Sequence, residues 1–325
     1  MMKSNKKNIS ATLCICAVSL LGLCASCDHN ETEPVPGIEA PETAYLEIDH
    51  IGVEGEVLSR ATAVPTSGEI GFYRSTANGY GAVNNNKGVW KKSAVTGNNA
   101  WIPDPMIKVG TADATMAIYY PYVSTNSGSL FLPAGQSGTT VSGKTVQETW
   151  SKRFTYNSLS SYNQTVSQEL KHVYAKLQVK LTKGTGFIGT PDWTKVKLAG
   201  TGICTSGNFN PLNNDAPALA DYTRTAGTLD LTLSSAINFN AITSTAVDLL
   251  LVPNTLSGDI TITITLGGKD MSVPVNSAAT NGFNGSLLPG KQYNLTITVN
   301  PTGLEIASLT AADWTTVSLP GESTN

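Results

Sequence analysis

Apolar and polar positions alternate with a period of two residues in several segments of the chain. The clearest case is HVYAKLQVKL at 172–181, where Val, Ala and Leu residues alternate with His, Tyr, Lys and Gln. The same alternation appears at 228–233, 259–268 and 293–301. Gly, Asn and Pro residues separate these segments, so the pattern predicts antiparallel strands with one face in water.

One further segment, AVDLLLVP at 246–253, is apolar on both faces and is predicted to be a central strand. No segment has the i, i+3, i+4, i+7 apolar spacing of an amphipathic helix over three turns. The sequence therefore predicts an all-β protein made of antiparallel β-sandwiches.

A polar stretch at 160–172 precedes the clearest strand pattern and indicates a domain junction near 165–170. The chain is long enough for two domains of ordinary size. We therefore expect an N-terminal β-sandwich domain at 61–168 and a C-terminal one at 169–325.

The N-terminus has the order of a secretory signal peptide. Lysines at the start are followed by an uncharged, largely apolar stretch that ends at Ser26 and is short for a membrane span. Cys27 comes directly after small residues, which resembles a bacterial lipobox. We therefore predict that residues 1–26 are a lipoprotein signal peptide. Cys27 would be the lipidated residue, anchored in the outer membrane by palmitate-type acyl chains.

Four of the five cysteines lie within the first 27 residues. A redox or zinc motif there would need a folded context that a signal peptide lacks. The remaining one, Cys204, has no partner for an intrachain disulfide after processing, and we predict that it is a small buried apolar residue.

Charge is distributed unevenly along the chain. Residues 28–59 contain nine Asp and Glu residues and no Lys or Arg, and the first basic residue that follows is Arg60. Within this leader, 44–58 also has the alternation of a strand. An accessible Arg between an acidic strand and a nearly neutral body indicates a strand that a protease can remove. The alternative is a solvated tether that holds the protein away from the membrane.

Several segments occur in an order that is similar to a known family. They are SRATAVPTSGEIGFY at 59–73, MAIYYPY at 116–122, LKHVYAKLQVKL at 170–181, VKLAGTGICTSGNFN at 196–210, VDLLLVPNTLSGDITITITLGGK at 247–269, LLPGKQYNLTITV at 287–299 and AADWTTV at 311–317. With the lipobox at Cys27, this ordered set resembles the fimbrillin family, the FimA/Mfa-like subunits of type V pili in Bacteroidales. None of the segments is a catalytic signature.

The resemblance implies two tandem transthyretin-like β-sandwich domains and export as a lipoprotein. It also implies that a trypsin-like or Arg-specific protease removes the first strand. By position, cleavage falls between Arg60 and Ala61, and the removed strand lies within 45–58 of an acidic leader at 27–60. The function implied is that of a structural or adhesive subunit of a cell-surface fimbria.

In this family the groove left by cleavage accepts a strand from the next subunit. The expected partners are therefore other pilus subunits, together with a host or microbial surface ligand. The donor candidate is the C-terminal segment 303–321. Its candidate anchors are Leu304, Ile306, Leu309, Trp314, Val317 and Leu319. A stalk or tip position is favoured over a basal anchor because Arg60 is present, and a plain core role for Trp314 stays open.

Enzyme motifs are absent from the sequence: there is no His-Glu-x-x-His, G-x-S-x-G or P-loop pattern. We therefore expect no enzyme activity, no cofactor and no metal site. His172 lies on the polar face of its predicted strand, where we expect it to be solvated or hydrogen-bonded. Charged residues make up only 14% of the chain, without a basic cluster, which disfavours nucleic-acid binding.

The main alternative is a surface-anchored glycan-binding lipoprotein with aromatic platforms for sugar rings. The candidate platforms are Tyr119, Tyr120, Tyr122 and Trp150, or Trp90 with Trp101. A simpler interpretation is that these aromatic side chains fill the cores of the sandwiches.

Overall fold

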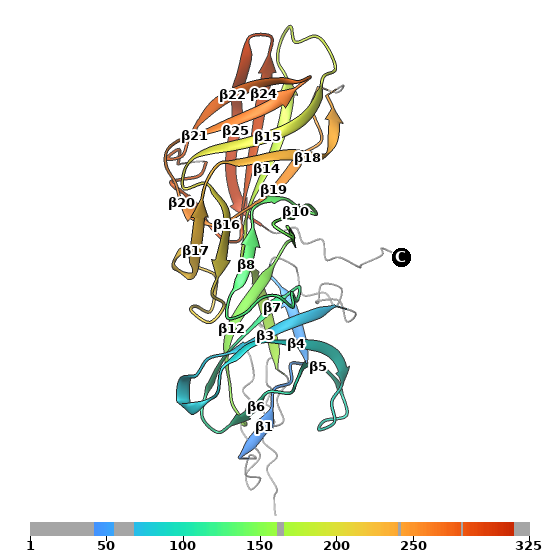
Figure 1. Cartoon of the computed structure of the whole chain (residues 1–325), viewed down its shortest axis with the longest axis vertical. Helices are drawn as coiled ribbons and strands as arrows, with labels where there is room; N and C mark the ends of the chain where they lie inside the picture. The colour runs from blue at the N-terminus through green and yellow to red at the C-terminus, as the bar shows by residue number, and fades with distance from the viewer. Residues whose placement is uncertain (1–41, 55–67, 161–165, 240–241, 281, 315–325) are drawn as a thin grey trace, which may run out of the picture. The chain divides into compact units, whose positions relative to one another are not determined.

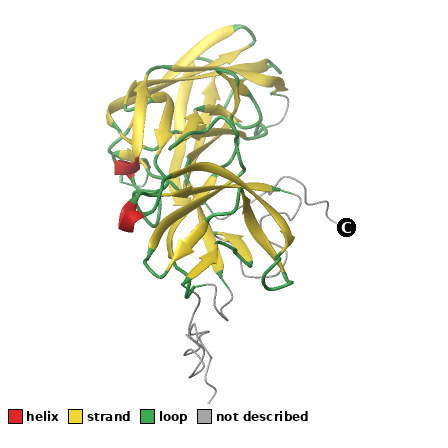
Figure 2. Ribbon diagram, turned by 60° about the horizontal axis from the view of Figure 1, so that its bottom comes forward, coloured by secondary structure: helices red, strands yellow, loops and turns green. Residues whose placement is uncertain are grey.

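The structure is a computed structural model that describes residues 42–54, 68–160, 166–239, 242–280 and 282–314. All of these residues belong to one compact unit. In the described part nearly all regular structure is strand, as Figures 1 and 2 show. The exceptions there are two single-turn 3₁₀ helices, η1 (Ala77–Gly79) and η2 (Leu219–Asp221). The predicted all-β fold is confirmed.

The largest sheet has seven strands, and all its neighbouring strands are antiparallel except β2 and β13. In spatial order they are β2 (His50–Val53), β13 (Ser167–His172), β12 (Trp150–Tyr156), β7 (Ala114–Tyr120), β3 (Glu69–Arg74), β4 (Val83–Lys92) and β5 (Asn99–Asp104).

Three further sheets contain most of the remaining strands. A five-stranded sheet has the order β25 (Gly303–Asp313), β24 (Lys291–Asn300), β14 (Ala175–Lys183), β19 (Val247–Leu251) and β9 (Gly135–Gln136). A four-stranded sheet has the order β18 (Leu229–Asn238), β15 (Asp192–Thr201), β21 (Ser257–Leu266) and β22 (Lys269–Asn276). A three-stranded sheet has the order β17 (Tyr222–Ala226), β16 (Cys204–Phe209) and β8 (Leu130–Pro133).

The short strands form two-stranded pairs. These are β1 (Thr43–Tyr45) with β6 (Lys108–Gly110), β10 (Thr140–Val141) with β11 (Lys144–Thr145), and β20 (Asn254–Thr255) with β23 (Ser286–Leu287). In the described part of the chain no helix is long and apolar enough to span a bilayer.

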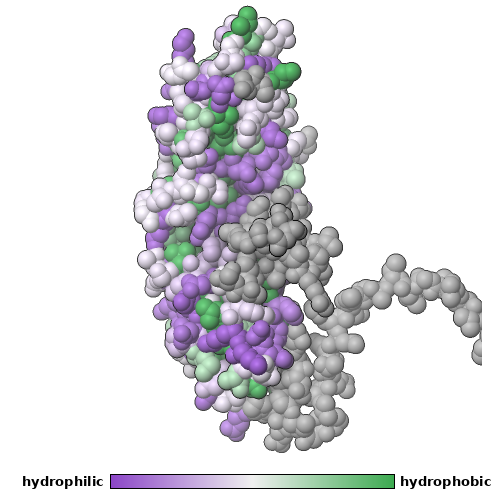
Figure 3. Space-filling model, turned by 90° about the vertical axis from the view of Figure 1, so that its right-hand side faces the viewer, coloured by the Kyte–Doolittle hydropathy of each residue, from purple (hydrophilic) through white to green (hydrophobic). Residues whose placement is uncertain are grey.

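Two hydrophobic clusters form the core. Strand β7 contributes to both: Met116 and Ile118 belong to one cluster, whereas Ala117 and Tyr119 belong to the other. Successive side chains of a strand point to opposite faces, so β7 is covered by apolar side chains on both sides. On the surface seen in Figure 3, polar side chains predominate and apolar ones are scattered among them.

The cluster that contains Ala117 and Tyr119, which we call the second cluster, lies between the five-stranded and four-stranded sheets, which pack face to face. Inward residues of β14, such as Leu177 and Val179, share it with Val196 of β15 and Ile262 of β21. The strands predicted at 228–233, 246–253, 259–268 and 293–301 are confirmed as β18, β19, β21 and β24. Cys204 is a free, buried thiol, as predicted.

The single strand predicted at 172–181 is wrong. Strand β13 ends at His172 and β14 begins at Ala175, and the two belong to different sheets. Val173 and Tyr174 between them are both buried, because the chain passes there from one sheet to the other. The His172 side chain, which we expected to be solvated or hydrogen-bonded, is buried rather than solvated and accepts a hydrogen bond from Trp150. The domain boundary at 168/169 stays a prediction.

Candidate functional site

The first described segment, residues 42–54, pairs with β5 at one edge of the seven-stranded sheet and then forms the opposite edge itself as β2. Strand β1 pairs antiparallel with β6, and the Leu46 amide then donates a hydrogen bond to the Ile107 carbonyl at 2.8 Å. Two residues later, Ile48 and Trp101 of β5 exchange backbone hydrogen bonds of 3.1 and 2.8 Å. Strand β5 is one edge of the sheet.

The segment changes its pairing partner at Asp49. The amides of Asp49 and His50 both donate to the Val166 carbonyl, at 2.8 and 3.2 Å. The Asp49 carboxylate accepts a hydrogen bond from the Val166 amide at 2.7 Å, which fixes the position at which the segment changes its pairing partner. Strand β2 then runs parallel to β13 and becomes the other edge of the sheet. One segment of about a dozen residues thus joins β5 to β13.

Four apolar side chains of this segment are buried in the cluster formed by the seven-stranded sheet. Leu46, Ile48, Ile51 and Val53 are at most 3% exposed. Their spacing is two, three and two residues, and the step of three falls where the partner changes. At roughly 1.5–3 kcal/mol for each fully buried side chain, the four contribute about 6–12 kcal/mol of gross burial. Without the segment, the sheet would have an open apolar slot and unpaired edge groups.

The predicted processing residues lie outside the described residues. This applies to Cys27, Arg60 and Ala61, and also to Val317 and Leu319 of the candidate donor segment. Residues 42–54, which we call the removable segment, belong to the part of the chain that cleavage is predicted to remove. The proposed cleavage point falls between this segment and β3, which begins at Glu69. Lipidation and cleavage at these positions stay predictions.

The described part of the donor candidate is strand β25, an edge strand that pairs antiparallel with β24. Leu304, Ile306 and Leu309 are half-buried against the second cluster. Trp314, which follows β25, is only 2% exposed, and its amide donates to the Gly290 carbonyl at 2.9 Å. In this structure the candidate donor strand is therefore part of the protein's own fold, and Trp314 is a core residue.

The indole of Trp314 lies against a buried histidine. Its ring stacks on His172, which accepts a hydrogen bond at Nε2 from the Trp150 indole N–H at 3.3 Å. Burial, and next the charge of Lys176, lowers the pKa of His172 to about 3. His172 is therefore neutral at ordinary pH and serves as an acceptor and stacking partner. Nothing in these contacts sets it up as a general base.

The carboxylates of Asp248 and Glu148 interact with Lys176, which lies beside the ring of Trp314. Lys176 pairs with Asp248 at 2.9 Å, and the Lys176 ammonium lies 5.2 Å from the Trp314 ring centroid. Burial raises the pKa of Glu148 to about 7; Lys176 opposes this shift, and Asp248 adds to it. One oxygen of Glu148 is buried without a hydrogen-bond partner. Among the described residues no His, Cys, Asp and Glu side chains form a metal-binding group. No pattern in the sequence indicated Glu148 or Lys176, because they and Asp248 come from three separate segments that only the fold brings together.

The aromatic residues proposed as sugar platforms are mostly core residues. Tyr119, Tyr120, Trp150 and Trp101 are at most 4% exposed. Their rings cannot stack on a sugar from solvent, so the simpler interpretation, that aromatic side chains fill the core, is confirmed for these four. Tyr122 and Trp90, by contrast, are half-buried.

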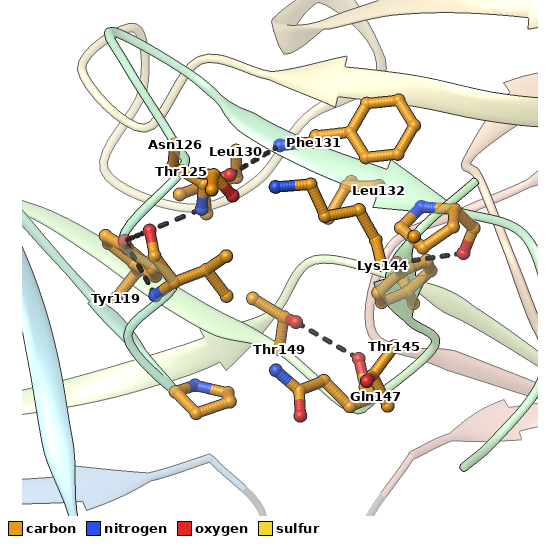
Figure 4. Close-up of a pocket in the computed structure, with 15 residues that line it drawn as sticks. Tyr119, Thr125, Asn126, Leu130, Phe131, Leu132, Lys144, Thr145, Gln147 and Thr149 are labelled. Carbon is orange, nitrogen blue, oxygen red and sulfur yellow. Dashed lines mark hydrogen bonds between the residues drawn. The ribbon is translucent and has the colours of Figure 1, made fainter. Parts of the chain in front are cut away.

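A separate cavity of about 240 Å³ opens beside β8, and Figure 4 shows its lining. It lies between the loop that follows β7, the hairpin β10–β11 and residues 147–149. Tyr119 forms part of its wall, and the Tyr119 hydroxyl donates to Asn85 Oδ1 at 2.6 Å and is contacted by Asn126 Nδ2 at 3.5 Å. Sequence reasoning did not foresee this cavity.

Residues 59–314 of the chain match the model of a protein family described as fimbrillin-like. No curated protein sequence is detectably similar to the chain. Among solved structures, a protein assigned to cell adhesion from Bacteroides uniformis is 18% identical, with a TM-score of 0.53 over 83% of this chain and 99% of that one. Another, from Bacteroides ovatus, is 18% identical with a TM-score of 0.51, over 85% and 100% respectively. At this identity the likeness shows the fold.

Proposed function

The chain belongs to the fimbrillin-like family of structural fimbrial subunits, and on that basis we propose how it is exported and assembled. It is exported as a lipoprotein anchored through Cys27 in the outer membrane. A trypsin-like or Arg-specific protease then cuts between Arg60 and Ala61. The chain finally joins other subunits of a cell-surface fimbria by donor-strand exchange.

The observation that carries this proposal is the position of residues 42–54. The segment precedes Arg60, pairs with β5 and β13, and buries four apolar side chains. Cleavage at Arg60 turns it into a separate peptide, which no longer benefits from being tethered to the fold. Its departure exposes an apolar slot and the edges of two strands, which favours pairing with a strand from another chain.

A donor strand from another subunit replaces the interactions that the removed segment made. It restores the backbone hydrogen bonds by β-augmentation and places alternate side chains in the slot. Docking and ordering costs offset part of the gross burial of about 6–12 kcal/mol. The candidate donor of this chain is 303–321. Because Trp314 is buried, β25 would have to detach from β24 and Trp314 from its contacts before the whole segment could be donated.

Limited proteolysis of the chain beginning at Asp28 tests the proposal. We expect trypsin to make one preferred cut, with Ala61 as the new N-terminus, and to yield multimers that persist on a denaturing gel without boiling. Arg60→Ala should abolish both the cut and the multimers. Arg60→Lys is the matched control, because trypsin still cleaves after Lys whereas an Arg-specific protease does not.

Two results would overturn the mechanism. The first is multimer formation by Arg60→Ala after protease treatment, which would show that this cut is not the trigger. The second is a cut at Arg60 after which residues 42–54 stay bound even when an excess of partner strand is supplied. A clean cut with loss of the leader but without multimers would instead assign the chain to a position that needs a different donor.

A further inference from the structure

The cavity beside β8 has the dimensions of a small-ligand site. Its volume of about 240 Å³ is slightly below the roughly 300–1,000 Å³ of pockets for drug-sized ligands. A ligand the size of one sugar residue or one amino acid therefore fits. The cavity is formed by residues 119–149 together with Tyr174, so it does not involve the removable segment or the candidate donor strand.

Lys144 is the one charged residue among the described residues that line the cavity. In Figure 4 its side chain extends from the hairpin β10–β11 into the cavity. Within the described part of the chain, its ammonium has no ion pair or hydrogen bond, and no Asp or Glu lines the cavity. A cation in a concave site without a counter-charge favours an anionic ligand.

Three more polar side chains of the lining also have no hydrogen-bond partner among the described residues: Thr125, Thr145 and Gln147. The wall behind them is different, because its polar groups are already paired. The Tyr119 hydroxyl bonds to Asn85, and the Tyr174 hydroxyl donates to the Pro133 carbonyl at 3.0 Å. The cavity thus has a fixed wall and several free groups that can bond to a ligand, which is the arrangement of a preformed site.

Much of the remaining lining is apolar. The half-buried Pro121, Val123 and Phe131 contribute to it, together with Leu130 and Leu132, which are each 1% exposed. A sugar ring has C–H groups for such a surface and hydroxyls for Thr and Gln side chains, and a carboxylate would pair with Lys144. We propose that this cavity binds the terminal carboxylated sugar of an acidic glycan.

Other anions fit less well. Inorganic phosphate would leave the apolar surface and most of the volume unfilled. A peptide carboxylate would need backbone partners, whereas the free groups here are side-chain hydroxyls, an amide and one amine. The site is independent of strand exchange, and the uncut Arg60→Ala chain can be used to study it.

Binding of glucuronic acid and glucose to the chain beginning at Asp28 tests the proposal, by calorimetry or ligand-observed NMR. The two sugars differ only in the carboxylate, so we expect glucuronic acid to bind at least about tenfold more tightly, the effect of one charge-assisted hydrogen bond. Lys144→Gln should remove this preference, and added salt should weaken it. Lys269→Gln, at an exposed lysine of β22, should leave it unchanged.

Equal binding of the two sugars would overturn the proposal, and so would an unchanged preference in Lys144→Gln. A short peptide that ends in a free carboxylate is the third arm. If the peptide binds as tightly as glucuronic acid and its binding is lost in Lys144→Gln, the site binds protein carboxylates instead. Binding of the sugar acid that persists in the Arg60→Ala chain keeps this result separate from any failure of assembly.

Discussion

The imidazole ring of His172 stacks on the indole ring of Trp314, with the ring centroids 3.8 Å apart and the planes 8° from parallel. His172 ends β13 of the seven-stranded sheet, whereas Trp314 follows β25 at the edge of the five-stranded sheet. The stack therefore fastens the end of the C-terminal strand to the other sheet. Any movement of β25 as a donor has to break this contact.

Replacement of Trp314 tests how strongly this contact holds. Trp314→Ala removes a side chain that is 2% exposed, and truncations of buried aromatic residues to Ala cost about 3–5 kcal/mol. Trp314→Phe keeps a ring over His172 and should lose less. Urea unfolding followed by circular dichroism measures both. Equal losses in the two variants would contradict a role for the stack.

His172 and Glu148 make the stability depend on pH in opposite directions. The pKa of His172 falls from 6.5 to about 3, so below pH 6.5 the unfolded chain takes up a proton that the folded chain refuses. This lowers the free energy of unfolding as the pH falls. The pKa of Glu148 rises from 4.5 to about 7, so between these values the folded chain keeps a proton that the unfolded chain releases. This raises the free energy of unfolding as the pH falls.

Between pH 6.5 and 4.5 the two effects should largely offset each other. In Glu148→Gln only the effect of His172 remains, so the free energy of unfolding should fall on acidification by up to about 1.4 kcal/mol per pH unit. His172→Gln should give a slope of the opposite sign. Urea unfolding across this pH range measures the slopes relative to the unsubstituted chain. Slopes of the same sign in the two variants would refute the assignment.

The alternation of residues correctly predicted β18, β21 and β24, because buried and more exposed positions alternate along these strands. It failed at 172–181, where the alternation continues through Val173 and Tyr174 although the chain changes sheet there. Sheet membership depends on tertiary contacts, and the local pattern does not contain them. The same limitation explains why a histidine on the expected polar face is buried.

The sequence indicated strand character in the leader but not its change of partner at Asp49. That change depends on Val166, which is more than a hundred residues away along the chain. The cavity had no sequence signal either. Lys144 reaches it only because the hairpin β10–β11 lies beside β8, and a single lysine in a polar loop indicates nothing by itself.

Substitution within the removable segment should affect only the uncut chain. Ile48→Ala truncates a fully buried side chain, which we expect to lower the free energy of unfolding by about 2–5 kcal/mol. Thr43→Ala, at an exposed position of β1, is the control and should change it by less than about 0.5 kcal/mol. Urea unfolding of the uncut chain gives both values.

After cleavage at Arg60 and release of the leader, the proposed assembly no longer includes Ile48. The multimers formed by the Ile48→Ala and unsubstituted chains should therefore be equally resistant to heating in detergent. Multimers that are less stable when they carry Ile48→Ala would mean that the leader stays in the assembled fimbria, contrary to strand exchange.

Two glycines provide a last, matched comparison. Gly71 of β3 lies under the ring of Tyr119, and a Cβ atom there would come within 1.8 Å of Tyr119 Cε1. Gly71→Ala must therefore displace a buried ring that forms the cavity wall, which costs typically about 1–3 kcal/mol. Gly52 of β2 has nothing within 4 Å of such a Cβ atom, so Gly52→Ala should be neutral or stabilise by about 0.4–1 kcal/mol. Urea unfolding distinguishes them, and binding of glucuronic acid should weaken in Gly71→Ala alone. Equal stability of the two variants would show that Tyr119 can move at no cost and that the wall is not fixed.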